Sequence, residues 1–541
     1  MPQKRPEGFE SQRSPLFLFV LPFALGILAS QILPLTGTVV ATLVGALVLL
    51  LLIAFPTPRD FRPWHVAFLV TVTCLGGIYG ARLIPPAGSI VQVHPKAVRE
   101  ESIQIDPVQT FVSPPYSEDQ VGLATARNQE GLVYYQAPRG SETHALPSGF
   151  WIELFGVIQP VEEFVTDPGF LQYLINRGAT VGIDSLRPGR ILTVDSIPRA
   201  TFSLLLQKSK TALSTGSSPL ESSTRVYQAL VLGQRTGLSA AQKKAFRDTG
   251  TAHLFAISGL HVGLVGTLLF FLFGRIRVRQ AIQVICTLSV LLFYVLLTGS
   301  TPSAVRAFLM IAFFVGAKAF DRAYCPTSAL AASALFVLLL DPAQITTLGF
   351  QLSYIVVLSI LVFGVPLSKT FLDATDPEYW LPGQSGSLFH RTRKWVFASL
   401  SISLAAFLGS SVLIVEHFQI LPLSSILLNL VLIVPATGVL YLGFLSLFFG
   451  LLGMPWLSAP LNALARLVID GMTAMVSTTA EVPYSSIPLT FSHSWVGPLG
   501  IFLFLCTAFW TANRPSFRIR YLLLPATSLV LTILLGTIPQ M

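Results

Sequence analysis

Long apolar runs separated by short polar loops dominate the pattern of the chain. A helix needs about 20 predominantly apolar residues to cross the hydrocarbon core of a bilayer. Runs near that length predict membrane helices at residues 16–33, 35–55, 64–84, 251–273, 280–298, 303–320, 326–340, 344–364, 394–415, 418–435, 437–453, 495–512 and 519–538. Residues 455–478 carry Arg466 and Asp470 and are amphipathic, so they lie in the interface or line an interior. The pattern therefore predicts a mainly α, polytopic helical membrane protein with about 10–13 membrane helices.

One long polar insert, residues 85–222, follows the third predicted helix. Residues 102–112, 131–135 and 149–158 alternate like strands and are separated by turns that contain Pro and Gly. An amphipathic helix, residues 201–214, leads back toward the membrane. We expect three parts: N-terminal membrane helices in 1–84, a small all-β domain with its linker in 85–222, and a membrane domain in 223–541.

The Lys and Arg residues of the short loops predict the orientation, because cytoplasmic loops are rich in these residues. If the chain starts inside and alternates, three spans place residues 85–222 outside the cytoplasm. The later basic clusters then fall inside, at Arg275/Arg277/Arg279, Lys318/Arg322, Arg391/Arg393/Lys394 and Arg514/Arg518/Arg520.

Composition agrees with a membrane protein and excludes a soluble globular chain. Of 541 residues, 52% are hydrophobic and only 11% charged, and the mean hydropathy is +0.68. Four cysteines stand singly in apolar sequence, without metal-ligand spacing: Cys74, Cys286, Cys325 and Cys506. The sequence predicts no metal site, no cofactor and no catalytic residue.

The net charge of +9 does not come from the insert. Residues 85–222 contain 10 Lys and Arg against 14 Asp and Glu, a net charge of −4, which leaves +13 for the rest of the chain. Part of this excess lies on the side predicted to be outside, where residues 223–272 carry a single acid, Asp248, against Arg225, Arg235, Lys243, Lys244 and Arg247.

Lys243, Lys244 and Arg247 fall on a short amphipathic helix that Ser239 is expected to cap. A cluster of cations outside the membrane attracts a polyanion, since contacts to phosphates supply most of the sequence-independent affinity for nucleic acid. Binding of the same helix to anionic lipid is the alternative.

Two histidines follow at the start of an apolar run, His253 and His261, with Ser258 and Gly259 between them. On an unbroken helix they would lie about 12 Å apart along the axis, too far to share a metal ion. Ser258 and Gly259 predict a break, and a broken helix at membrane depth is tolerated where it faces protein or water. We therefore expect a re-entrant or pore-lining element. Ser258 as a nucleophile with His261 as its base is the alternative, but no acid partner is evident.

Further polar residues interrupt later apolar runs: Arg306, Gln351, Glu416, His417 and Asn429. Arg306 and Glu416 are expected near the outer ends of their helices, where they pair or line one hydrophilic path. Taken singly, each residue also fits an interhelical hydrogen bond or a side chain that reaches the interface. Taken with residues 230–265, they favour a shared polar interior.

Several of these segments resemble the ComEC family of competence proteins. The resemblance is carried by LVLGQRTGLSAAQKKAFRDTGTAHLFAISGLHVGL from residue 230, by TPSAVRAFLM, by DPAQITTLGFQLSYIVVLSI and by EHFQILPLSSILLNLVLIVPA. In the insert, DPGFLQYLINRGATVGID is similar to the end of that family's external OB-like domain. The resemblance implies a channel in the bacterial inner membrane that passes single-stranded DNA during natural transformation, with the OB-like domain outside the cytoplasm. Arg235, Lys243, Lys244, Arg247, His253, Ser258, Gly259, His261, Arg306, Gln351, Glu416, His417 and Asn429 would bind DNA or line the channel.

Many family members also contain a metallo-β-lactamase-like domain, and no His-x-His-x-Asp-His motif of that kind occurs here. No GxxxxGK[ST] loop occurs either. We therefore expect single-stranded DNA and membrane lipid as partners, together with a separate DNA receptor, an ATPase motor and a nuclease; a homo-oligomer stays open. The rival hypothesis is an intramembrane enzyme, or a transporter of a small or lipidic substrate, on the same scaffold.

Overall fold

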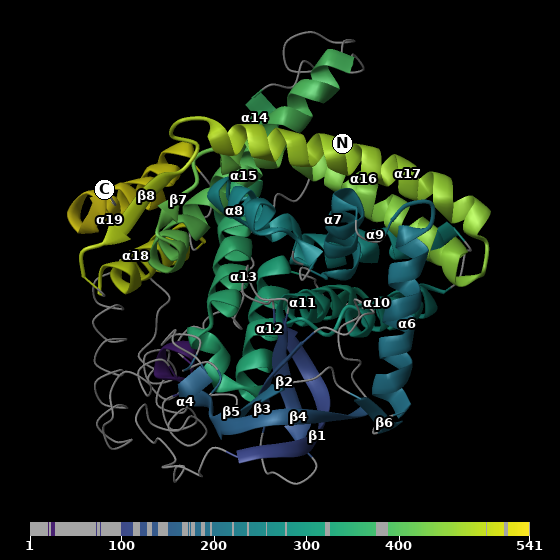
Figure 1. Cartoon of the computed structure of the whole chain (residues 1–541). Helices are drawn as coiled ribbons and strands as arrows, with labels where there is room; N and C mark the ends of the chain where they lie inside the picture. Colours follow the sequence, from purple (N-terminus) through teal and green to yellow (C-terminus); the bar gives the residue numbers. More distant parts are fainter. Residues whose placement is uncertain are drawn as a thin grey trace.

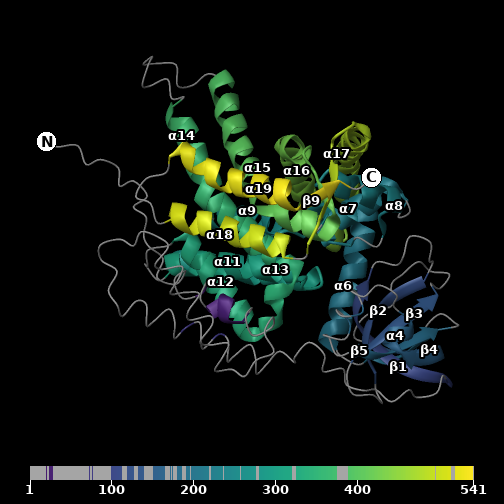
Figure 2. The ribbon, with the colours of Figure 1, turned by 90° about the vertical axis from the view of Figure 1, so that its left-hand side faces the viewer.

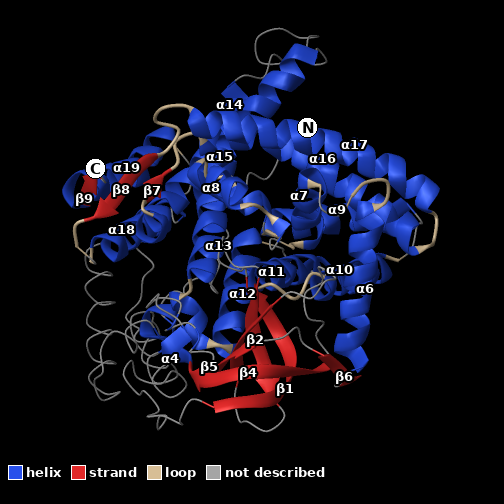
Figure 3. Cartoon of the chain, viewed as in Figure 1, coloured by secondary structure: helices blue, strands red, loops and turns tan. Residues whose placement is uncertain are grey.

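A computed structural model describes the strands between residues 99 and 194 and, apart from short loops, residues 197–512 and 518–539. Before residue 99 it describes only residues 20, 23–27, 72 and 76, all helical, so the predicted helix 35–55 and most of the predicted helices 16–33 and 64–84 lie outside the described residues. Six strands gather at one end of the molecule, three short strands lie together near the C-terminus, and helices make up the rest (Figure 3). The predicted mainly helical architecture is confirmed.

The insert contains a six-stranded sheet of order β1-β2-β3-β5-β4-β6. An additional β1–β4 pairing closes five of these strands into a ring, and β3 and β5 are its parallel neighbours. Alternate residues fill the inside, with Leu123, Tyr135, Ile152, Leu154 and Ile183 fully buried. The strands are β1 (Arg99–Phe111), β2 (Asp119–Ala126), β3 (Leu132–Pro138), β4 (Phe150–Pro160), β5 (Ala179–Ser185) and β6 (Arg190–Val194), with the short α4 (Val161–Phe164) after β4.

Helix α6 (Ile197–Ser214) leads from this sheet to the helical part, as Figures 1 and 2 both show. The helical part begins with α7 (Ser222–Leu232), α8 (Ala240–Asp248), the 3₁₀ helix η2 (Ala252–Phe255), α9 (Gly259–Arg275), α10 (Gln280–Leu297), α11 (Pro302–Ala319) and α12 (Pro326–Leu340). It continues with η3 (Pro342–Thr346), α13 (Leu348–Ser359), the π-helical turn η4 (Ile360–Gly364), α14 (Val365–Ala374), α15 (Leu388–Phe418), α16 (Ser425–Leu451), α17 (Pro455–Glu481), α18 (Val496–Ala512), η6 (Ile519–Leu522) and α19 (Leu523–Gly536).

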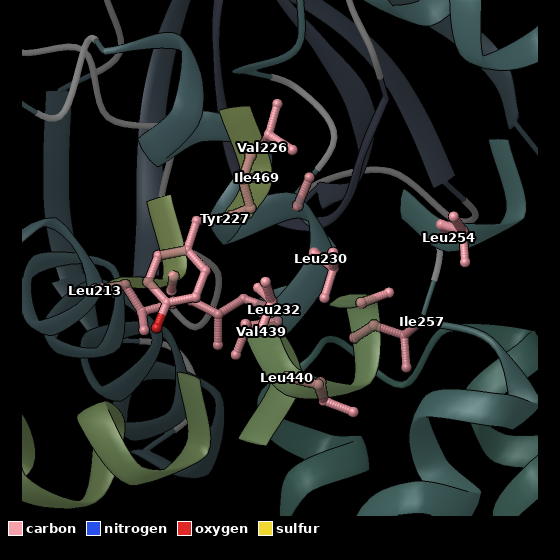
Figure 4. Close-up of a cluster of buried hydrophobic side chains, with 14 of the residues drawn as sticks. Leu213, Val226, Tyr227, Leu230, Leu232, Leu254, Ile257, Val439, Leu440 and Ile469 are labelled. Atoms are coloured by element: carbon pink, nitrogen blue, oxygen red, sulfur yellow. The ribbon is translucent and has the colours of Figure 1, made fainter. Parts of the chain in front are cut away.

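Two hydrophobic cores hold the helices together. One joins α7 to α9, α10, α16 and α17, with Tyr227 and Leu230 of α7 fully buried at its centre (Figure 4). The Tyr294 hydroxyl of α10 donates to the Val231 carbonyl over 2.9 Å in the same region. The second core joins α12, α13, α15, α18 and α19. The segment before α9 therefore belongs to the packed membrane domain and not to the insert.

Four described helices are long and apolar enough to cross a membrane: Gln280–Leu297, Leu348–Phe371, Thr392–Phe418 and Ser425–Leu451. Five shorter apolar helices accompany them. The prediction of separate spans at 418–435 and 437–453 is wrong. Residues 425–451 form one helix that contains Pro435, and the chain turns before it, where β7 (Ile420–Leu421) follows α15. Hydropathy alone placed the boundary between helices near residue 436 instead of between Phe418 and Ser425. The reason is that the sequence is apolar on both sides of the actual turn.

The ambiguous segment 455–478 is part of α17, which lies against α16 along its whole length. At one end, the Ser446 hydroxyl donates to Asn462 Oδ1 over 2.5 Å; at the other, the Ser424 amide donates to the Ser485 carbonyl over 3.0 Å. Strand β8 (Ile487–Phe491) then pairs with β7 and with β9 (Thr537–Pro539). The ends of α15, α17 and α19 therefore meet in one small sheet, and α17 lies antiparallel beside α16.

Candidate functional site

The basic segment forms helix α8, as predicted, and a capping box fixes its start. The Ser239 hydroxyl accepts from the backbone amide of Gln242 over 3.2 Å, and Gln242 Oε1 accepts from the backbone amide of Ser239 over 3.0 Å. Phe246 is buried in the first core, whereas Lys244 and Arg247 are exposed and Lys243 is half-buried. Arg247 also forms an ion pair with Asp248 over 3.1 Å. The helix is therefore anchored by an apolar residue and presents its cations outward.

Gly250 sets where α8 lies on the membrane domain. Its φ of 70° is the left-handed conformation that favours glycine, and a Cβ there would come within 2.8 Å of Ser425 Cβ and 2.9 Å of Pro422 Cγ. The end of α8 is thus pressed against the turn between α15 and α16. The cations consequently lie at the end of the helical bundle where the sheet of β7, β8 and β9 forms.

The predicted break between the histidines is present. The α-helix of the predicted span 251–273 begins only at Gly259, after the 3₁₀ turn η2. His253 Nδ1 donates to the Gly250 carbonyl over 3.1 Å, and the Ser303 hydroxyl of α11 donates to the Ile257 carbonyl over 2.7 Å. Polar groups freed by the break therefore find partners inside the protein.

His261 and Ser258 form a compact pair at the start of α9. His261 Nδ1 lies 3.2 Å from the Ser258 amide nitrogen and 2.8 Å from its hydroxyl. Because a backbone amide can only donate, Nδ1 is the acceptor and the hydroxyl donates as well. Ser258 is the N-cap of α9, and His261 is three residues later. In a capping box the side chain at that position, usually Glu or Gln, accepts from the backbone amide of the N-cap. His261 forms this half of the box with its imidazole. Among the described contacts of His261 there is no carboxylate.

Arg306 and Glu416 do not pair. Arg306 is buried on α11, where Nη2 donates to the Gly349 carbonyl over 2.8 Å and to the Ser353 hydroxyl over 3.0 Å. Glu416 lies two residues before the end of α15, and its Oε2 has no hydrogen-bond partner among the described residues. The Arg306 guanidinium instead links α11 to α13. It therefore forms an interhelical hydrogen bond, which was the alternative to a role in a hydrophilic path.

The other predicted residues fall in separate places. Gln351 Nε2 donates to the Ile345 carbonyl over 3.1 Å and joins α13 to η3. His417 Nδ1 donates to the Leu413 carbonyl over 3.1 Å, and Asn429 Oδ1 is buried on α16 without a described partner. Glu416 lines a cavity of about 120 Å³ with Val415, Gln419, Thr490, Phe491 and His493. Arg235 lies outside the described residues. The structure thus brings together residues 243–261, but no described contact joins them to Arg306 or Glu416.

Sequence reasoning missed a buried polar cluster on α17. Asn462 Nδ2 donates to the carbonyls of Ala212 over 2.9 Å and Thr215 over 3.2 Å, and Arg466 Nη2 donates to that of Gly216 over 3.3 Å. These side chains satisfy carbonyls at the C-terminal end of α6, which have no partners within the helix. Arg466 had marked the segment as amphipathic, but the sequence did not indicate that Arg466 and Asn462 bind the end of α6. Among the described residues, no group of three His, Cys, Asp or Glu side chains is placed to hold a metal ion.

The competence protein family matches residues 230–514, which include α8, the break, α11 and α15 to α18. The chain belongs to this family. Membership confirms the resemblance to ComEC that residues 230–264 predicted. The chain is 29% identical over 274 residues to ComE operon protein 3 of Bacillus subtilis, covering 48% of this chain and 32% of that protein.

Two other relatives match shorter regions. Competence protein ComA of Neisseria gonorrhoeae is 32% identical over 147 residues, 25% of this chain and 21% of its own length. Recombination protein 2 of Haemophilus influenzae is 30% identical over 132 residues, 23% of this chain and 17% of its own length. The chain thus spans a third or less of these relatives. No solved structure matches it.

Proposed function

We propose that the protein is a channel of the bacterial inner membrane for the uptake of single-stranded DNA during natural transformation. The observation that carries the proposal is the outward cationic face of α8, held by Gly250 beside the broken entrance to α9. Lys243, Lys244 and Arg247 gather the phosphates, and His253, Ser258, Gly259 and His261 line the path that follows. Family membership and the names of two competence relatives support the same reading.

The placement of α8 suits this role because each cation that neutralises a phosphate releases a counterion. The ion pair of Arg247 with Asp248 is half-exposed, and such pairs contribute little, so a phosphate can displace the carboxylate. Binding to anionic lipid remains the competing role of the same cations, and the experiment below separates the two.

We assign the first DNA contact to α8 rather than to the insert. The ring of β1, β2, β3, β5 and β4 fits the OB-like barrel of the proposal, and such barrels bind single strands with a positive groove and stacking aromatics. Here Tyr134 and Tyr135 are buried, so these two rings offer no stacking surface. The insert also has a net charge of −4. In this proposal it lies outside the cytoplasm and positions α6 against α16 and α17.

A DNA receptor, an ATPase motor and a nuclease are proposed as separate partners. Of the rival roles, an intramembrane enzyme would use the hydrogen bond between Ser258 and His261, but these residues are also arranged as a helix cap and their described contacts include no carboxylate. A transporter of a small or lipidic substrate is the second rival, and DNA import separates it from the proposal.

The test replaces Lys243, Lys244 and Arg247 with alanine in the host. DNA import should fall at least about tenfold, since three phosphate contacts are lost, while the amount of protein in the membrane stays normal. Arg187, Arg190 and Arg199 of the insert, changed together to alanine, remove the same charge on the same predicted side and should leave import unchanged. Normal import by the α8 variant, or an equal loss in both variants, contradicts the proposal. Loss of liposome binding with intact import would assign α8 to lipid.

A further inference from the structure

Helix α17 carries a carboxylate at the middle of its exposed face. The hydrogen bond between Ser446 and Asn462 fixes the register of α16 against α17. The two helices are antiparallel, so moving forward along α17 means moving back along α16. Asp470 comes eight residues after Asn462 and therefore lies level with Gly438, eight residues before Ser446 and at the middle of the 27-residue α16. Since α16 is long and apolar enough to cross a membrane, Asp470 lies at the depth of the hydrocarbon core.

The exposed faces of these two neighbours differ in kind. On α16 the exposed large side chains are apolar, as at Leu427, Val434 and Phe448, which suits contact with lipid. On α17 the exposed face runs from Leu467 through Asp470 to Ala474 and Thr478. Figures 1 and 2 show the two helices side by side along one edge of the helical part.

On this face only the carboxylate of Asp470 lacks a partner among the described residues. The hydroxyls of Ser477 and Thr478 donate to carbonyls of the preceding turn of α17, so they are satisfied at any depth. Asp470 is exposed, and no described residue binds its side chain. A charged group facing lipid at this depth is expensive, and such residues instead pair with another charge or face water.

We propose that the exposed face of α17 binds a membrane helix of a partner protein that carries a Lys or Arg at the depth of Asp470. Charge complementarity selects this partner. A second copy related by a twofold axis along the membrane normal would place two Asp470 carboxylates against each other, which is unfavourable. Gly471 has no heavy atom within 4 Å of a Cβ added to it, so the partner helix can approach the backbone closely. The proposal does not depend on DNA as the transported molecule.

The experiment places a photocrosslinking amino acid at Leu467 or at Ala474 in the full chain, in membranes of the host. Val434 of α16, which is also exposed near the same depth, is the matched control. We expect a crosslink from α17, absent at Val434, to a peptide of another membrane protein that combines an apolar span with a Lys or Arg. The yield should fall about tenfold with Asp470→Asn and be retained with Asp470→Glu, since one interhelical ionic contact is lost.

A charge exchange completes the test. Asp470→Lys should abolish the crosslink, and replacing the basic residue of the captured span by Asp should restore it. A crosslink within this chain, to a second copy of it, to imported DNA or only to lipid overturns the proposal, as does an unchanged yield with Asp470→Asn. DNA import is measured in parallel: loss of the crosslink with normal import separates this interface from channel function.

Discussion

The imidazole of His261 accepts two hydrogen bonds from Ser258 through one nitrogen, and this geometry decides between two chemistries. A nucleophilic serine needs a base that is itself oriented by a third group. Here the ring nitrogen facing the hydroxyl is already engaged by a backbone amide, and the described contacts include no carboxylate. At the scale of the residue, the described contacts of the pair are those of a helix cap.

The cap can be tested at His261. Because Gln is a natural partner in a capping box, His261→Gln should keep the stability of the protein and its DNA import. His261→Leu should lower the free energy of unfolding by about 1 kcal/mol, the usual contribution of an N-terminal cap. Thermal unfolding in detergent and import in cells measure the two effects. Complete loss of function in His261→Gln with normal stability would favour the enzymatic alternative.

Tyr135 should make the stability of the protein depend on pH in the alkaline range. Burial raises the pKa of its phenol above the ordinary value, so the folded state holds the proton more tightly than the unfolded state does. That contribution is fully present below the unfolded pKa of about 10 and is lost as the pH rises through the folded pKa. Tyr135→Phe should therefore move the alkaline unfolding midpoint to higher pH.

The same variant should gain up to about 1 kcal/mol at neutral pH, because the buried hydroxyl of Tyr135 has no described hydrogen-bond partner. Tyr484→Phe, at an exposed position, serves as the control and should leave the midpoint unchanged. Circular dichroism across the alkaline range gives both values. A midpoint that falls in Tyr135→Phe would contradict the argument.

At the scale of elements, α16 shows why hydropathy does not count helices correctly. Apolar residues continue across the turn before Ser425, so composition does not mark where α15 ends and α16 begins. Pro435 suggests a boundary, yet the helix continues through it because neighbouring helices hold its two halves. Packing therefore decides where this helix starts and stops.

Two glycines of α16 test that packing. A Cβ at Gly443 would lie 2.6 Å from Val231 Cγ2 of α7, whereas nothing lies within 4 Å of one at Gly438. Gly443→Ala should cost about 1–3 kcal/mol through overpacking. Gly438→Ala should be neutral or gain up to about 1 kcal/mol from helix propensity. Equal thermal shifts in the two variants would mean that α7 does not pack against α16 as described.

At the scale of the whole molecule, the small sheet of β7, β8 and β9 constrains the path across the membrane. Its strands follow α15, α17 and α19, so these three helices end on one side. With α16 and α17 each crossing once, the basic loop between α18 and α19 returns to the side predicted to be cytoplasmic. Loop charges alone are too few between residues 437 and 494 to give this result.

Cysteine labelling tests the path. In a chain without its four native cysteines, Glu481→Cys and Phe418→Cys should react with an impermeant maleimide in intact cells, whereas Met454→Cys should react only after permeabilisation. The reason is that Met454 and Glu481 lie at opposite ends of α17. Equal labelling of Met454→Cys and Glu481→Cys would place α17 flat in the interface and contradict the assignment.

The candidate site was predictable to the extent that it is local in sequence. The capping box of α8, the cations on its outer face and the break at Ser258 and Gly259 all follow from neighbouring residues. The partners of Arg306 did not follow, because Gly349 and Ser353 lie more than 40 positions away and the choice between them and Glu416 depends on helix packing. Asn462 was missed for the same reason, since the carbonyls that it binds belong to α6.

The sequence by itself determined that this is a helical membrane protein with a polar β insert, that a cationic helix precedes a broken apolar helix, and that the chain resembles the ComEC family. These properties depend on composition, periodicity and short motifs, which act over a few residues. Only the tertiary structure decided that α16 is one helix, that α17 packs beside it with Asp470 exposed at its middle, and that Arg306 binds α13. Contacts between distant segments fix these features, and hydropathy carries no information about which apolar helices pack together.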